Sequence, residues 1–150
     1  MKKVISFAIP VYNEEDNILD VYNDVCKVMD EMCPNYQYEF IFTDNRSEDG
    51  SVQILSELGG MDPRVKVLSF SKNYGYQKSI ITGYSYASGE AIIQLDCDLQ
   101  DPPSMVPIFI KKWEEGNDVV YGIRGKRDEG FFIRNIRKGY YRFISKVSSD

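Results

Sequence analysis

The sequence has no histidine, and its three cysteines, Cys26, Cys33 and Cys97, form no Cys-x-x-Cys pair. These absences argue against a structural zinc site. They also exclude Ser-His-Asp and Cys-His catalytic arrangements. Few and unpatterned cysteines suit a reducing compartment, where each thiol packs as a small core residue.

Long apolar runs are also missing, and none approaches the ~20 residues that span a bilayer. The segment 4–11 after Lys2 and Lys3 is apolar, but Ser6 and Pro10 interrupt it, and no small-residue cleavage site follows. We therefore interpret it as a buried first strand and not as a signal peptide.

The charge is distributed unevenly along the 150 residues, whose net charge is −5. Residues 1–123 hold 10 basic and 20 acidic side chains (net −10), whereas residues 124–150 hold 8 and 3 (net +5). An acidic body argues against nucleic acid as a partner. It fits an anionic ligand bound through a metal, or an anionic membrane surface beneath the basic segment.

Apolar runs alternate with helical periodicity along the chain. We expect strands over 3–9, 38–43, 65–70, 91–95 and 118–121, and helices over 14–33, 48–58, 76–87 and 102–115. This alternation predicts an α/β domain with a mainly parallel sheet and right-handed crossovers. Asn13 and Ser47 are candidate helix N-caps, and Gly59-Gly60 is a candidate helix end. We place a core domain at 1–123 and a basic segment at 124–150.

Polar loops follow three of the expected strands, at residues 12–14, 44–46 and 96–98. In open parallel sheets, ligands bind beyond the carboxyl ends of the strands, so this is a nucleotide-binding layout. Neither G-x-G-x-x-G nor G-x-x-x-x-G-K-[ST] occurs in the sequence. A bound diphosphate would then be held by a metal instead of a glycine-rich helix start.

An acidic motif follows the apolar run 91–95. In an extended chain, Asp96, Asp98 and Gln100 point to the same side. Their oxygen atoms are ligands of the kind that Mg²⁺ and Mn²⁺ prefer. Two adjacent carboxylates would repel without a cation. The alternative is an ordinary surface turn or helix cap, but the position at the end of a buried strand favours a metal and diphosphate site.

The C-terminal segment combines an apolar stripe over 132–147 with basic residues on its remaining face. Basic amphipathic helices that carry aromatic residues lie at membrane surfaces. The alternative is a helix packed on the domain with its basic face in water. The sequence stops at Asp150 without a helix end, so we expect this region to continue in a longer protein.

Five stretches, 9–15, 43–51, 71–77, 96–103 and 121–124, together resemble the family 2 glycosyltransferases, which have the GT-A fold. The last three are similar to the branch that transfers sugars to polyprenyl phosphates: dolichol-phosphate mannose synthases and bacterial undecaprenyl-phosphate glucosyltransferases. The chain departs from the pattern at Asn45 and Arg46, where relatives often have Asp-Gly. Arg46 either alters which base or sugar is bound or is a solvated loop residue.

The resemblance implies roles for individual residues. Those implied for nucleotide binding are Pro10, Tyr12, Glu14, Asp44 and Asp96. Those implied for binding Mg²⁺ or Mn²⁺ are Asp96, Asp98 and Gln100. Those implied for the acceptor phosphate are Arg124, Arg137, Lys138 and Arg142, with Asp98 and Arg124 as the catalytic residues.

The leading hypothesis is an inverting, metal-dependent transfer of a sugar from a nucleotide-diphosphate donor, expected to be a UDP-sugar, to a polyprenyl phosphate. We expect it at the cytoplasmic, inner face of a membrane. A phosphate with a second pKa near ~6 is already nucleophilic at neutral pH, whereas a sugar hydroxyl needs a general base. Two alternatives stay open: a soluble family 2 enzyme that glycosylates a polysaccharide, and a non-catalytic module that binds nucleotide-sugar or membrane.

Overall fold

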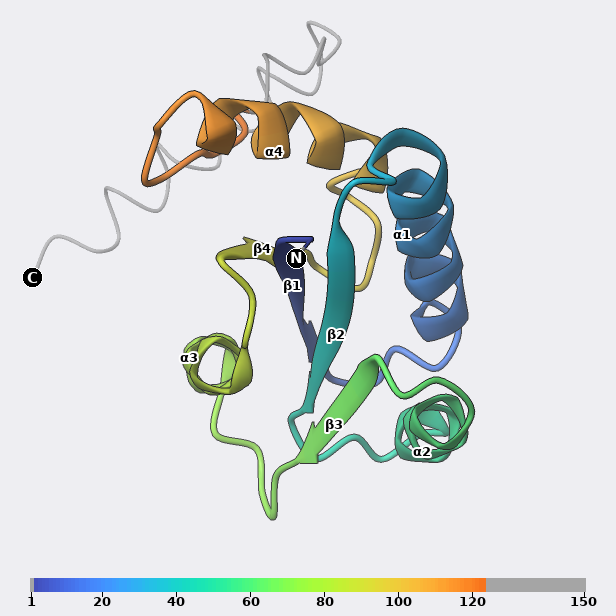
Figure 1. Cartoon of the computed structure of the whole chain (residues 1–150). Helices are drawn as coiled ribbons and strands as arrows, with labels where there is room; N and C mark the ends of the chain where they lie inside the picture. Colours follow the sequence, from blue (N-terminus) through green and yellow to red (C-terminus); the bar gives the residue numbers. More distant parts are fainter. Residues whose placement is uncertain (1, 124–150) are drawn as a thin grey trace, which may run out of the picture. The chain divides into compact units, whose positions relative to one another are not determined.

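The computed structural model describes residues 2–123. Within them, a four-stranded sheet has the order β3-β2-β1-β4, and all three pairings are parallel (Figure 1). The strands are β1 (Val4–Val11), β2 (Gln37–Asp44), β3 (Val65–Ser69) and β4 (Ala91–Gln94). The helices are α1 (Ile18–Met32), α2 (Ser51–Met61), α3 (Tyr76–Tyr86), the 3₁₀ turn η1 (Pro103–Met105) and α4 (Val106–Glu114). The predicted α/β architecture with a parallel sheet is confirmed.

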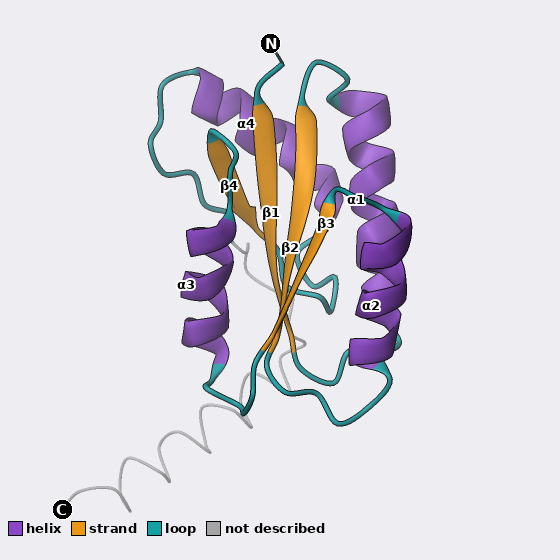
Figure 2. Cartoon of the chain, turned by 60° about the horizontal axis from the view of Figure 1, so that its bottom comes forward, coloured by secondary structure: helices purple, strands orange, loops and turns teal. Residues whose placement is uncertain are grey.

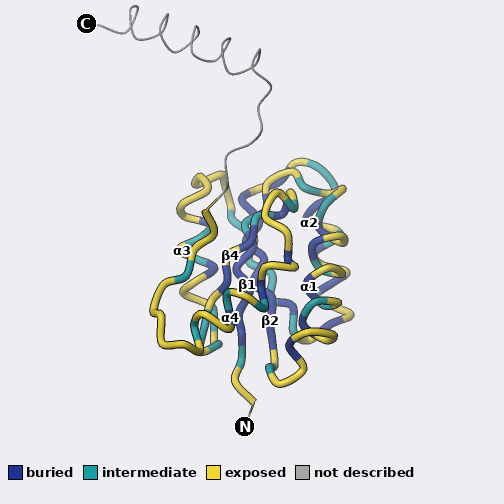
Figure 3. The backbone as a smooth tube through the Cα atoms, turned by 90° about the horizontal axis from the view of Figure 1, so that it is seen from above, coloured by how far each residue is buried: buried dark blue, intermediate teal, exposed yellow. Residues whose placement is uncertain are grey.

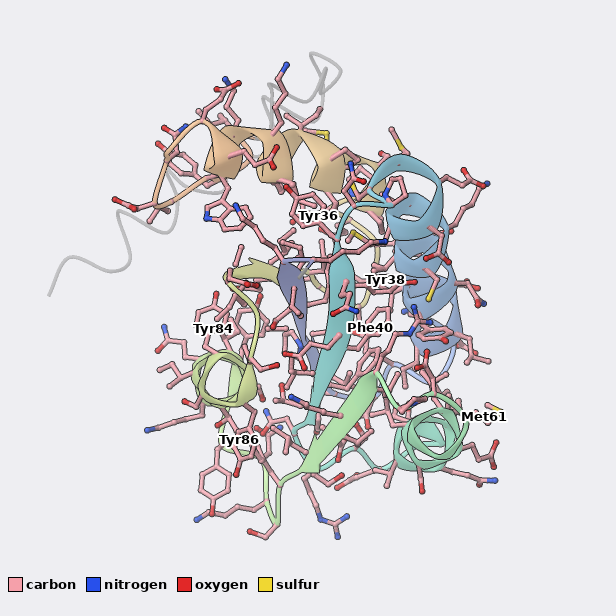
Figure 4. The ribbon with its side chains drawn as sticks, viewed as in Figure 1. Tyr36, Tyr38, Phe40, Met61, Tyr84 and Tyr86 are labelled. Carbon is pink, nitrogen blue, oxygen red and sulfur yellow. The ribbon has the colours of Figure 1, made fainter. Side chains whose placement is uncertain are left out.

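The large apolar core lies on the face of the sheet that α1 and α2 cover (Figure 2). Phe7, Phe40 and Phe42 are completely buried there. The ring of Phe40, which Figure 4 labels, stacks on the ring of Phe42 with 5.9 Å between their centroids. Its centroid lies 5.0 Å from that of Tyr22 on α1. The strands form the buried centre of the fold, as Figure 3 shows. Burial of this apolar surface is the main force that holds the sheet and α1 together.

The opposite face of the sheet carries smaller side chains and is covered by α3 (Figure 2). A Cβ atom added at Gly83 would lie 3.3 Å from the Cβ of Ala8 and 3.7 Å from Cγ2 of Thr43. The missing side chain at Gly83 therefore lets α3 lie close against β1 and β2. This close packing fixes the position of α3 against the sheet, and with it the position of the first turn of the helix.

A buried carboxylate fastens the junction between α3 and β4 to the sheet. Glu39 on β2 accepts hydrogen bonds from the hydroxyl of Ser6 (2.7 Å) and from the amide and hydroxyl of Ser88 (2.7 and 2.8 Å). Its other oxygen lies 2.8 Å from Nζ of Lys66. Burial alone would raise the pKa of Glu39, but the bonds from Lys66, Ser6 and Ser88 outweigh it and lower the pKa to about 2.

The strand expected over 118–121 is wrong: these residues lie outside the sheet, and the described part of the chain ends in an irregular segment. The side chains of Val119 and Tyr121 are 79% and 76% exposed. β-branched and aromatic residues favour a strand only where a neighbouring strand supplies ladder hydrogen bonds and packing. Among residues 2–123, no such partner pairs with this segment.

The expected helix ends are also partly wrong. Asn13 and Ser47 do not cap their own helices, because α1 begins at Ile18 and α2 begins at Ser51. Gly59-Gly60 lies inside α2, which ends at Met61. The two candidate caps instead bond to each other's loops, as described below. The expected end of α4 before Gly116, whose φ is 93°, is confirmed.

Contacts group Met1–Val120 into one compact unit. Within residues 2–123, none of the helices is both long enough and apolar enough to cross a bilayer. Residues 124–150 lie outside the described residues. The boundary after residue 123 and the basic amphipathic helix therefore stay predictions.

Candidate active site

The carboxyl ends of β1, β2 and β4 meet at one edge of the sheet, away from the N-terminus in Figure 2. The register pairs Val11 with Asp44 and Ala8 with Gln94. The three polar loops predicted to bind the nucleotide and metal therefore leave the sheet side by side. Parallel sheets of this kind bind their ligands beyond this edge.

Unusual backbone conformations gather in the same loops. Within residues 2–123, the non-glycine residues with positive φ are Asn13 (55°), Arg46 (67°) and Leu99 (55°). One follows each of β1, β2 and β4, and the loop after β3 contains Gly75 with φ 86°. Left-handed backbone is uncommon outside glycine and clusters at functional sites. The strain thus points to the same edge as the motifs do, by an independent argument.

Hydrogen bonds join the loops after β1 and β2 into one unit. The amide of Asn13 donates to Oγ of Ser47 (2.9 Å), and the amide of Glu48 donates to Oδ1 of Asn13 (2.8 Å). The amide of Glu14 donates to Oγ of Ser51 (2.9 Å). Two of the motifs found in the sequence therefore hold each other in place before any ligand binds.

The predicted nucleotide-binding residues lie in and next to these joined loops. Tyr12 is exposed, and Pro10 and Glu14 are half-buried. Asp44 is 1% exposed, and its Oδ1 accepts the amide of Ser47 at 3.2 Å. Asp44 thus supports its own loop, and its contact with a nucleotide stays a prediction.

A pair of asparagines links the loop after β2 to the loop after β3. Nδ2 of Asn45 donates to Oδ1 of Asn73 (2.9 Å), and the amide of Tyr74 donates to Oδ1 of Asn45 (2.8 Å). The amide of Gly75 also donates to Oδ1 of Asn73 (2.9 Å). Sequence reasoning treated Asn45 only as a departure from the family pattern. The structure shows that it positions the start of α3.

The acidic motif does not have the extended geometry assumed from the sequence. β4 ends at Gln94, and residues 97–98 form a turn. Oδ1 of Asp98 accepts the amide of Gln100 at 3.1 Å, which is a local turn contact. The alternation argument therefore does not apply after Gln94, because it requires a strand. Asp96 is half-buried, and Asp98 and Gln100 are exposed.

The donor chemistry of this loop fits a hard divalent cation in part. Within residues 2–123, no three acidic or cysteine side chains converge as a ready metal cage. Magnesium, however, is usually held by one or two carboxylates, with waters and substrate phosphates as the other ligands. Asp96 and Asp98 supply two carboxylates from one short loop, so they fit a metal that arrives with a diphosphate.

Cys97 shows that the loops after β1 and β4 are close together. Its side chain is 2% exposed, and burial is the largest cause of a shift that raises the pKa of the thiol to about 12. The negative charges of Glu14, Asp98 and Asp96 are the smaller causes of the same shift. The thiol is therefore protonated at neutral pH and packs in the core, as the sequence predicts, and the carboxylates of Glu14, Asp96 and Asp98 lie near enough to affect its pKa.

A tyrosine within the stretch 71–77, which was not among the predicted site residues, contacts the acidic motif. Tyr76, the first residue of α3, donates its hydroxyl hydrogen bond to Oδ1 of Asp96. Nε2 of Gln94 donates to the same tyrosine oxygen (2.9 Å), and Tyr84 donates to Oε1 of Gln94 (2.8 Å). Burial and the bond to Asp96 both raise the pKa of Tyr76. No local sequence pattern predicts a contact between residues on separate elements.

The predicted acceptor residues Arg124, Arg137, Lys138 and Arg142 lie outside the described residues.

Known proteins match the chain over most of its length. A family model described as glycosyl transferase family 2 matches residues 6–148. The uncharacterized glycosyltransferase YkcC of Bacillus subtilis is 45% identical over 144 residues, which are 95% of this chain and 44% of the relative. The bactoprenol glucosyl transferase of Shigella phage SfV is 36% identical over 97% of this chain and 47% of the relative. The chain thus spans about half the length of these relatives.

Solved structures share the fold. A mannosyltransferase from Pyrobaculum calidifontis, in complex with GDP-Man and Mn²⁺, has a TM-score of 0.60 and 20% identity over 73% of this chain and 31% of its own. A glucosyl-3-phosphoglycerate synthase from Mycobacterium tuberculosis, with Mn²⁺ and UDP, has a TM-score of 0.57 and 23% identity over 74% of this chain and 39% of its own. These likenesses confirm the predicted GT-A fold. The family model, which matches residues 6–148, establishes that the chain belongs to glycosyl transferase family 2.

Proposed function

We propose that this chain is the donor-binding part of a metal-dependent, inverting glycosyltransferase that moves a sugar from a nucleoside diphosphate to a polyprenyl phosphate. The observation that carries the proposal is the position of Asp96 and Asp98. They occupy the loop after β4, at the same edge of the sheet as the joined loops after β1 and β2. UDP-sugar is the proposed donor.

The charge of the domain supports metal dependence. Residues 1–123 carry 20 acidic and 10 basic side chains, so the body repels an unaccompanied diphosphate. In the proposal, Asp96 and Asp98 hold Mg²⁺ or Mn²⁺, with Gln100 as a further ligand. When bound, the metal supplies Lewis-acid stabilisation of the charge that develops on the departing diphosphate.

The chain's own residues orient the donor. The loops that carry Tyr12, Glu14 and Asp44 are already bonded to one another, so little of their conformational entropy remains to be lost on binding. The exposed ring of Tyr12 and the half-buried carboxylate of Glu14 are proposed to border the base and ribose. Glu14 is held by a 2.6 Å bond from Nδ2 of Asn17 to its Oε2.

A phosphate acceptor is favoured by two considerations. An acceptor phosphate with a second pKa near ~6 is already ionised at neutral pH and needs cations, not a general base. The basic residues Arg124, Arg137, Lys138 and Arg142 are proposed to supply those cations at the inner face of a membrane. The names of several relatives, bactoprenol glucosyl transferase, support the same acceptor class.

The test is a transfer assay with the full-length protein, Mn²⁺, UDP-glucose or GDP-mannose, and either undecaprenyl phosphate or an oligosaccharide. We expect labelled sugar in the lipid product from the UDP-sugar, with inverted anomeric configuration. Transfer only to the oligosaccharide would favour a polysaccharide-building enzyme. Nucleotide binding without any transfer would favour a non-catalytic module.

Asp98→Asn tests the site itself. Loss of one carboxylate removes a metal ligand and should abolish Mn²⁺-dependent UDP binding, measured by isothermal titration calorimetry. Asp24→Asn is the matched control, because it makes the same change of charge at an exposed position on α1. Unchanged UDP affinity in Asp98→Asn would contradict the proposed metal site.

A further inference from the structure

Four side chains form a continuous hydrogen-bonded chain along the edge of the sheet. Tyr84 donates to Oε1 of Gln94 at 2.8 Å, and Nε2 of Gln94 donates to the oxygen of Tyr76 at 2.9 Å. Tyr76 in turn donates to Oδ1 of Asp96. Tyr84 projects from α3 on the side of β4 (Figure 4). This hydrogen-bonded chain of side chains thus connects α3, β4 and the acidic loop.

The direction of these bonds follows from their chemistry. A tyrosine hydroxyl has one proton to donate, and the amide of Gln94 has separate donor and acceptor atoms. Because Gln94 donates to Tyr76, the one proton of Tyr76 is directed to Asp96. Because Tyr84 occupies the carbonyl oxygen of Gln94, the amide group is held in the orientation that makes this donation possible. Each bond therefore fixes the next.

The structural setting gives Tyr76 a fixed place. Its loop is held by the bonds between Asn45, Asn73 and Gly75, and Ser79, one turn later, is buried against the sheet. Asp96 by contrast lies beyond the last residue of β4. The bond from Tyr76 fixes Oδ1 of this carboxylate and thereby restricts its rotation.

Stability alone does not account for this chain of bonds. Tyr76 and Tyr84 are 51% and 41% exposed, and Gln94 is exposed as well. Water can satisfy exposed hydroxyl and amide groups, so such bonds contribute little to folding free energy. Their alignment toward a carboxylate of the site is better explained by an effect on that carboxylate.

We propose that Tyr76, Gln94 and Tyr84 are positioning residues that hold the Asp96 carboxylate in the orientation that binds the metal and diphosphate. The inference rests on the proposed function, because it assigns these residues to the same site. None of the three belongs to the set of site residues predicted from the sequence. Groups that orient a metal-binding carboxylate commonly change metal affinity by about 10- to 100-fold when they are removed.

The experiment measures UDP binding to the full-length protein across a Mn²⁺ titration, by calorimetry, for Tyr76→Phe, Tyr84→Phe and the double variant. We expect Tyr76→Phe to raise the Mn²⁺ concentration for half-maximal binding about tenfold, and Tyr84→Phe to raise it by a smaller factor. The double variant should match Tyr76→Phe. Once the bond from Tyr76 to Asp96 is lost, removing the Tyr84 hydroxyl can have no further effect on Asp96. Unfolding temperatures should remain at the wild-type value.

Tyr86→Phe is the matched control. It removes a hydroxyl from an exposed tyrosine on the same helix, at a position without a hydroxyl partner among the described residues, so binding should not change. Wild-type Mn²⁺ dependence in Tyr76→Phe, or additive effects of the two substitutions, would overturn the positioning role. Failure of the proposed function would give a different result, because the wild-type protein would then show no Mn²⁺-dependent binding of either UDP or GDP. The positioning role would be wrong in that case too.

Discussion

At the scale of single residues, Asn13 shows how one side chain serves two loops. Its backbone is left-handed, with φ 55°, and its Oδ1 accepts the amide of Glu48 at 2.8 Å. Asparagine tolerates this conformation better than most residues, because its short polar side chain can bond locally. The residue therefore joins the loop after β1 to the loop after β2 at low cost in strain.

Substitutions at Asn13 should separate strain from hydrogen bonding. Asn13→Gly keeps the left-handed backbone and loses the bond, at a cost of about 1 kcal/mol in the free energy of unfolding. Asn13→Ala loses the bond and also strains the backbone, which adds about 1 kcal/mol. Urea unfolding of both variants checks this order. Equal stability of the alanine and glycine variants would show that backbone strain at this position is negligible.

At the scale of elements, the loop between α3 and β4 depends on one buried acid. Glu39 binds Ser6, Ser88 and Lys66, and these bonds lower its pKa from 4.5 to about 2. A depressed acidic pKa stabilises the folded state above the ordinary pKa. That contribution is lost as the pH falls from about 5 toward about 2. The carboxylate therefore links stability at this junction to pH.

Glu39→Gln should lower the free energy of unfolding by about 2 kcal/mol at pH 7, because it removes the charge that Lys66 and the serines contact. The difference from wild type should shrink by roughly half at pH 3, because the carboxylate of the unfolded chain is then mostly protonated while that of the folded protein is still ionised. Urea titrations between pH 7 and pH 3 measure it. Glu57→Gln, an exposed change on α2, is the control. A difference that stays constant with pH would show that the charge of Glu39 is not responsible.

At the scale of the whole molecule, the division of charge separates two proposed tasks. The body of residues 1–123 has a net charge of −10, and the segment 124–150 has a net charge of +5. An acidic body needs a cation to bind a diphosphate, whereas a basic segment attracts anionic lipid directly. Donor binding and acceptor binding are therefore expected to respond differently to the same loss of basic charge.

Replacing Arg137, Lys138 and Arg142 together by alanine should separate these tasks in the full-length protein. Each basic residue near an anionic surface contributes about 1 kcal/mol, so binding to phosphatidylglycerol vesicles should fall roughly hundredfold. Mn²⁺-dependent UDP binding should remain at the wild-type level. Vesicle flotation and calorimetry measure the two quantities. Equal losses of both would mean that the segment supports the fold or the donor site and not the acceptor side.

The sequence by itself determined the α/β class, the parallel sheet and the edge at which the polar loops gather. Apolar periodicity identifies each of the four observed strands, and the rule that ligands bind beyond the carboxyl ends of parallel strands then selects the edge. The strand predicted over 118–121 is wrong, because the composition of these residues favours a strand but no neighbouring strand pairs with them among the described residues.

Only the tertiary structure decided how the site is held together. The bonds from Asn13 to Ser47 and from Tyr76 to Asp96 join residues 34 and 20 positions apart. The turn at Asp98 likewise replaced the extended geometry that the sequence suggested. A side chain bonds to whichever group the packing of helices against the sheet brings within about 3 Å. Local sequence sets each residue's capacity to bond, and the packing of distant elements selects the partner.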